Sequence, residues 1–62
     1  MVIKNVSLEQ LSYIIFEHRP IGIFFSKEGD EYIVVDNTEG EAIVHSFTIK
    51  KQFHEFMKKH VK

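Results

Sequence analysis

Histidine and acidic side chains near the C-terminus come closest to a catalytic pattern in this sequence. A zinc-protease helix needs two histidines four residues apart, because that spacing places both on one face. The residue four positions after His54 is Lys58, and His60 falls on another side of a helix. The spacing therefore predicts no metal site in this segment.

Residues 36–41 combine acidic side chains with a glycine, as a calcium-binding loop does. In that loop the glycine is sixth and a bidentate glutamate is twelfth. Counted from Asp36, Gly40 is fifth, and no glutamate occupies the twelfth position. A hairpin turn is the better interpretation of this segment.

Residues that could supply a nucleophile are few. The sequence has no cysteine, which excludes a thiol nucleophile, thiolate metal ligands and disulfides. A catalytic pocket is also hard to build from 62 residues. We therefore predict no enzyme activity, no catalytic residues, no metal and no cofactor. The serines without a recognisable activating neighbour are Ser7, Ser12, Ser26 and Ser46.

Length and composition describe one small domain spanning residues 1–62. Hydrophobic residues make up 44% of the chain. A domain of this size needs them, because it buries only about 60% of the surface that its unfolded chain exposes. No apolar run approaches the roughly 20 residues of a membrane span, and the N-terminus lacks a signal-peptide pattern. We expect a cytoplasmic protein.

Two amphipathic helices are indicated. Residues 7–10 fit a capping box, in which Ser7 accepts a hydrogen bond from the backbone of Gln10 and the Gln10 side chain reaches back. The first helix is predicted over residues 8–18, because Pro20 disfavours helical geometry before it. Thr48 is a candidate N-cap for the last helix. The apolar face of the last helix comprises Ile49, Phe53, Phe56, Met57 and Val61.

Three segments rich in β-branched and aromatic residues, 21–26, 31–36 and 42–47, predict strands. Short loops that contain glycine join them, which forces sequential antiparallel pairing. The predicted fold is α+β, a three-stranded antiparallel meander flanked by an N-terminal and a C-terminal helix (α-β-β-β-α). Residues 1–6 fit either a short strand or a packed arm.

Both faces of this sheet are apolar. If Gly29 closes a three-residue loop, one face carries Ile21, Ile23, Phe25, Ile33 and Val35, and the other carries Phe24, Tyr32 and Val34. A different loop length would flip the second strand relative to the first but leave both faces apolar. Either the helices lie on opposite sides, or the N-terminal arm covers one face, or an apolar patch stays open.

An open apolar patch would mark an interaction site, either between two copies of the chain or with another protein. Residues off the main stripe of the first helix could extend it. The predicted partner interface comprises Phe24, Tyr32, Val34, Tyr13 and Phe16.

Charge is unevenly distributed, although the net charge is only −1. Residues 28–41 contain acids and no base, whereas residues 49–62 contain five lysines and one acid, Glu55. Such polarity can steer a charged partner, although the solvation of hairpin tips and helix backs is the simpler explanation. The predicted acidic surface comprises Glu28, Asp30, Glu31, Glu39 and Glu41.

Nucleic-acid binding is the alternative function. Lysines of the last helix could contact phosphates, and Phe24 with Tyr32 could stack on bases. Against it, Arg19 is the only arginine, and the acidic hairpins would repel a duplex. This alternative surface comprises Lys50, Lys51, Lys58 and Lys59.

Residues 32–42 contain a strand that ends in Asp36-Asn37 and a turn at Gly40, and Phe47-Thr48 then precede a lysine-rich amphipathic helix. This arrangement resembles small phage and prophage proteins of Gram-positive bacteria. The α-β-β-β-α order is also similar to that of a small anti-CRISPR inhibitor, whose acidic surface occupies the DNA site of a nuclease. The resemblance implies a phage or mobile-element protein that binds and modulates a host protein. We therefore predict a small non-enzymatic protein-interaction module that self-associates.

Overall fold

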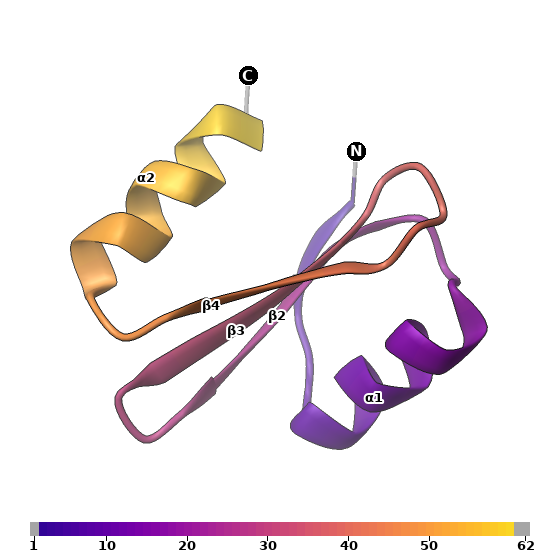
Figure 1. Ribbon diagram of the computed structural model, residues 1–62, viewed down its shortest axis with the longest axis horizontal. Coiled ribbons are helices and arrows are strands. Elements are labelled where there is room, and N and C mark those ends of the chain that lie inside the picture. Colours follow the sequence, from indigo (N-terminus) through magenta and orange to yellow (C-terminus); the bar gives the residue numbers. More distant parts are fainter. Residues whose placement is uncertain (1, 61–62) are drawn as a thin grey trace.

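The chain forms a four-stranded sheet with one helix on each face (Figure 1). The structure, a computed structural model, describes residues 2–60. Met1, Val61 and Lys62 lie outside the described residues, and with them the expected end of the last helix. The elements in chain order are β1 (Ile3–Asn5), α1 (Leu8–Glu17), β2 (Gly22–Glu28), β3 (Glu31–Asn37), β4 (Ile43–Phe47) and α2 (Lys50–His60).

The α+β class and the three antiparallel strands agree with the prediction, but the sheet is larger and mixed. Its order is β1-β2-β3-β4, and β1 pairs with β2 in parallel. The backbone N–H of Ile23 donates to the Val2 carbonyl at 2.8 Å, and that of Val6 donates to the Phe25 carbonyl at 2.9 Å. The N-terminal segment is therefore a strand, and α1 is the crossover that parallel pairing requires.

Helix α1 begins at the expected cap and ends close to the predicted boundary. Ser7 Oγ accepts a hydrogen bond from the Gln10 backbone N–H at 3.1 Å, which satisfies one of the free donors of the first turn. The cap at the other end is His18, whose φ of 58° is left-handed and whose N–H donates to the Ile14 carbonyl at 2.8 Å. The helix therefore ends one residue before the predicted boundary.

The β2–β3 hairpin corrects the predicted distribution of side chains between the faces. Glu28 pairs with Glu31, so the loop has two residues, and Gly29 takes the positive φ of 61° there. A loop shorter by one residue than expected flips β3 relative to β2. The side chains of Ile23 and Phe25 therefore share a face with Tyr32 and Val34, and Phe24 shares the opposite face with Ile33 and Val35.

Each helix covers one of these faces with its own core. The core under α1 contains Leu11, Ile14, Phe24, Val35 and Ala42. The core under α2 contains Ile23, Val34 and Phe53, with partly buried aromatic residues around them. Of the arrangements considered from the sequence, the one with helices on opposite sides is therefore found.

The predicted open patch is wrong for this reason. Phe24 is 3% exposed beneath α1, and Val34 is fully buried beneath α2. The open patch was one of the arrangements expected because so short a chain leaves few residues to cover both faces of the sheet. Helices of 10 and 11 residues suffice for both, because the described strands have no more than seven residues.

Candidate interaction surface and pocket

The residues of the predicted partner interface do not form one surface. Phe24 and Val34 are buried on opposite faces of the sheet. Tyr32 packs against α2, where its ring stacks on Phe53 with centroids 4.3 Å apart. Tyr13 and Phe16 are exposed on the outer side of α1, by 51% and 82%. They do not extend an apolar sheet face, because α1 itself covers that face.

The outer edge of β4 is an uncovered apolar feature of the described chain. β4 lies at one end of the strand order, and no strand among residues 2–60 pairs with its outer side. Ile43 and Val44 are 48% and 49% exposed. Val44 pairs with Val35, so its side chain lies on the α1 face, while Ile43 lies on the α2 face. Both faces of this edge are therefore apolar and accessible.

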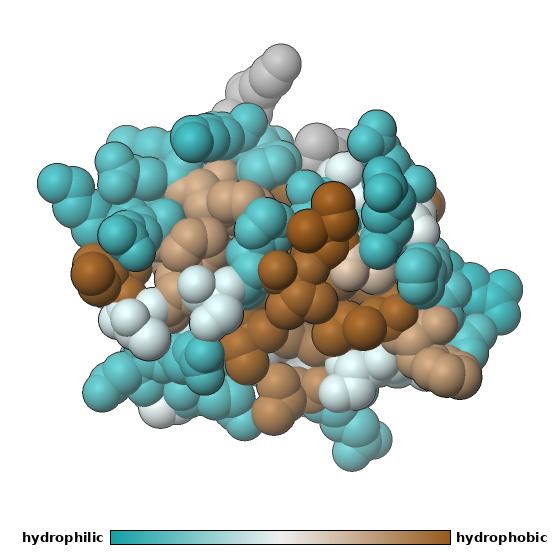
Figure 2. All heavy atoms as spheres, viewed as in Figure 1, coloured by the Kyte–Doolittle hydropathy of each residue, from teal (hydrophilic) through white to brown (hydrophobic). Residues whose placement is uncertain are grey.

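Helix α1 adds to this edge. Its Gln10 side lies beside β1, so the opposite side, which carries Leu8 and Ile15, lies toward β4. These two residues are 42% and 38% exposed. Viewed with β4 in front, hydrophobic side chains form a band across the middle of the molecule (Figures 1 and 2). We call Leu8, Ile15, Ile43 and Val44 the β4 surface.

Charges of opposite sign lie at the two ends of β4. Glu39 and Glu41 are exposed in the loop that precedes it. Lys50 and Lys51 are exposed at the start of α2, just after it. The strand itself contains neither lysine, arginine nor acid. The strand β4 therefore begins with exposed apolar side chains, with acidic residues just before it and basic residues just after it.

The predicted acidic surface is divided by the fold. Glu28, Asp30 and Glu31 lie at the β2–β3 hairpin, whereas Glu39 and Glu41 lie in the β3–β4 loop. These loops are at opposite ends of β3, a strand of seven residues. Seven residues of strand span roughly 20 Å. The acids therefore form two separate clusters.

The lysines of the alternative nucleic-acid surface are all exposed on α2, but they form two pairs. Lys50 and Lys51 lie in the first turn and Lys58 and Lys59 in the last. Glu55 is four residues from both Lys51 and Lys59, so it lies between them on the same side of the helix. An acid thus interrupts the basic stripe, and nucleic-acid binding stays a prediction.

Asp36 forms a polar cluster beside β4 on the α2 face. Its Oδ1 accepts hydrogen bonds from the Thr38 hydroxyl at 2.7 Å and the Thr38 backbone N–H at 3.1 Å. Its Oδ2 lies 3.6 Å from His60 Nε2. Burial raises the pKa of Asp36, but the bonds from Thr38 and the nearby His60 and His45 outweigh it, so the net pKa lies below the usual 3.8. The cluster connects α2 to β3.

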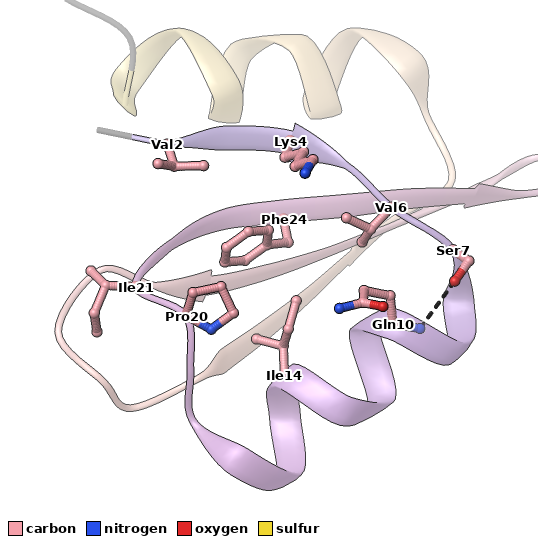
Figure 3. A pocket seen from close by; sticks show the side chains of 9 residues that line it. All are labelled: Val2, Lys4, Val6, Ser7, Gln10, Ile14, Pro20, Ile21 and Phe24. Carbon is pink, nitrogen blue, oxygen red and sulfur yellow. Dashed lines mark hydrogen bonds between the residues drawn. The ribbon is translucent and has the colours of Figure 1, made fainter.

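A pocket that the sequence did not indicate lies between β1 and α1 (Figure 3). Its volume is about 450 Å³, although a pocket of this size was expected to be hard to build from so short a chain. Lys4, Ser7 and Gln10 are its polar lining residues. The apolar lining comprises Val2, Val6, Ile14, Pro20, Ile21 and Phe24.

Two residues of the predicted capping box, Ser7 and Gln10, line this pocket. The Ser7 hydroxyl caps the Gln10 N–H, but the Gln10 side chain forms no hydrogen bond with any described residue. Its amide instead points into the space below β1 and β2 (Figure 3). Because the Gln10 side chain was predicted to act as a cap, it was not identified as a polar residue of the pocket.

Within residues 2–60, no three histidine, aspartate or glutamate side chains lie close enough together to hold a metal ion. Neither described helix has the length and apolarity needed to span a bilayer. Comparisons with models of protein families, with curated proteins and with solved structures found no match.

Proposed function

We propose that this chain is a protein-interaction domain that self-associates through the edge of β4. The single observation that carries the proposal is an unpaired edge strand with half-exposed Ile43 and Val44 at its start. Unpaired edges are templates for pairing with another chain. Proteins that avoid such pairing place lysine or proline on the edge or cover it, and β4 contains neither residue.

The neighbouring side chains favour the same use. Leu8 and Ile15 of α1 extend the apolar area beside the edge on the α1 face. Contiguous exposed apolar patches of this kind mark interaction sites. A partner that added a strand to β4 would gain main-chain hydrogen bonds and would also bury these side chains.

A second copy of the chain fits this surface by charge. In an antiparallel pairing centred on His45, the middle of β4, Ile43 of one copy lies opposite Phe47 of the other, so the loop before β4 of one copy lies near the start of α2 of the other. Glu39 and Glu41 of each copy then approach Lys50 and Lys51 of its partner. Two-fold symmetry repeats the contact at the other end. The product is one continuous sheet across two copies.

Sedimentation equilibrium over a range of concentrations tests the self-association. We expect a dimer with a dissociation constant below about 1 mM. Val44→Lys should give a monomer that keeps the wild-type circular dichroism spectrum, because Val44 is 49% exposed and its loss leaves the cores intact. A wild-type protein that stays monomeric at a protein concentration of about 1 mM would overturn the proposal. A dimer that Val44→Lys leaves unchanged would overturn it too.

Charge-reversal variants test the antiparallel orientation of the two β4 strands in the proposed dimer. Lys51→Glu should weaken dimerisation by about tenfold, the equivalent of about 1.4 kcal/mol, and Glu39→Lys in the same chain should restore it. Lys58→Glu is the matched control, because Lys58 is equally exposed on α2 but lies far from β4 in sequence and at the other end of the helix. Equal effects of Lys51→Glu and Lys58→Glu would contradict the antiparallel pairing.

A further inference from the structure

We infer that the pocket between β1 and α1 binds a small molecule that combines an apolar body with a carboxylate. This site lies on the opposite side of α1 from the β4 surface. It is therefore independent of the proposed self-association.

The pocket has the size and the lining of a small-molecule site. Its volume of about 450 Å³ lies within the roughly 300–1,000 Å³ of typical ligand pockets. Ile14 and Phe24, which are 1% and 3% exposed, form part of the wall and are fixed by the core under α1. Val2 and Ile21 are 52% and 55% exposed. These two side chains would be covered by an apolar ligand.

The wall formed by β1 is held at a fixed distance from β2. The Val2 carbonyl accepts a hydrogen bond from Ile23, and it lies so close to Gly22 that a Cβ there would be 2.8 Å away. The opposite wall is α1, whose Leu11 and Ile14 are anchored in the core. The pocket is therefore formed before a ligand binds, which lowers the ordering cost of binding.

Lys4 gives the pocket its charge preference. It pairs with Phe24 in the β1–β2 register, so its side chain lies on the α1 face above the pocket (Figure 3). No acidic residue among residues 2–60 lies within 4.0 Å of its ammonium group, and none lines the pocket. An anionic ligand would supply the missing counter-charge.

Gln10 provides the second polar contact from the opposite wall. Its amide makes no hydrogen bond to a described residue and points into the pocket (Figure 3). A carboxylate can accept hydrogen bonds from a lysine ammonium and an amide N–H together. Lys4 and Gln10 therefore recognise the carboxylate, and the apolar wall holds the rest of the molecule.

The test uses octanoate as the probe and octanamide, its neutral counterpart of equal length, as the control ligand. In a titration followed by two-dimensional amide NMR, octanoate should cause saturable shifts in residues 2–7, 10, 14 and 21–24. Octanamide should bind about tenfold more weakly, because it lacks the charge that Lys4 pairs with.

Variants of Lys4 complete the experiment. Lys4→Met should weaken octanoate binding about tenfold without changing octanamide binding, and Lys4→Arg should keep octanoate binding. Lys59→Met is the matched control, since Lys59 is exposed on α2, across the sheet. Absence of saturable shifts, equal binding of the two probes, equal effects of Lys4→Met and Lys59→Met, or shifts confined to β4 would each overturn the inference.

Discussion

Asn37 shows how one side chain can hold two loops of this small chain together. Its side chain is fully buried at the end of β3. The amide Nδ2 donates to the Pro20 carbonyl at 2.8 Å, and Oδ1 accepts from the Ala42 backbone N–H at 3.1 Å. The segment after α1 and the segment before β4 are therefore fixed to each other. Since buried polar groups are costly when unpaired, this residue stabilises the entry into β4.

The carboxylate of Asp36 makes stability depend on pH. Because its pKa in the folded protein lies below 3.8, it stabilises the fold above that pH, and the stabilisation disappears as the pH falls through the folded pKa. In Asp36→Asn this contribution is absent. The free energy of unfolding of the wild type should therefore fall more steeply than that of Asp36→Asn between about pH 5 and pH 2.

Urea unfolding at a series of pH values measures this difference. Glu39→Gln serves as the control, because Glu39 is an exposed acid in the loop that follows. Parallel pH curves for the wild type and Asp36→Asn would show that the contacts with Thr38 and His60 contribute no net stability.

The roles of single residues could be predicted where they depend only on neighbouring residues in the sequence. Ser7 was predicted to be a cap from the capping box at residues 7–10, and it caps α1. Asn37 was read only as a turn residue, because its partners at Pro20 and Ala42 are set by the tertiary fold. The burial of Phe24 and Val34 was missed for the same reason, since it depends on where two helices pack.

At the scale of the elements, the position of strand β1 beside β2 depends on Gly22. Gly22 has a φ of 146°, and a Cβ at this position would lie 2.8 Å from the Val2 carbonyl oxygen. Gly22→Ala should therefore destabilise the protein both through backbone strain and by forcing β1 away from β2. We expect a loss of about 1–3 kcal/mol in the free energy of unfolding, with faster amide exchange at Ile23.

Gly40→Ala separates the two causes. Gly40 also has a positive φ, 79°, but a Cβ there would meet nothing within 4 Å. The additional loss in Gly22→Ala thus reports the contact with β1. Equal losses in the two variants, measured by denaturant unfolding, would show that β1 contributes nothing through this contact.

The sequence predicts the longer helices and strands but does not decide whether the shortest element, β1, is a strand. The helices carry regularly spaced apolar residues and the three antiparallel strands carry runs of β-branched and aromatic residues, and these features predicted the elements, with strand ends that differ by up to two residues. β1 has three residues, too few for a period, and its parallel partner is 20 residues away in the register. The loop at Gly29 has two residues rather than three, and that single step decides which side chains share a face.

At the scale of the whole molecule, the two cores are joined by one sheet. Val34 belongs to the core under α2 and Val35 to the core under α1, and they are consecutive residues of β3. Loosening one helix therefore disturbs the strand on which the other packs. We infer that the described chain unfolds as one unit, which suits a domain with little stability to spare.

The variant Phe53→Leu tests whether the described chain unfolds as one unit. Phe53 is 6% exposed and packs on Ile23 and Val34, so the smaller side chain should cost about 1 kcal/mol. If the chain unfolds as one unit, hydrogen exchange of α1 amides should accelerate by the same factor as exchange of α2 amides, although Phe53 lies on the other face of the sheet. Phe16→Leu should change neither rate, because Phe16 is 82% exposed. Acceleration confined to α2 would instead show that the two cores open independently.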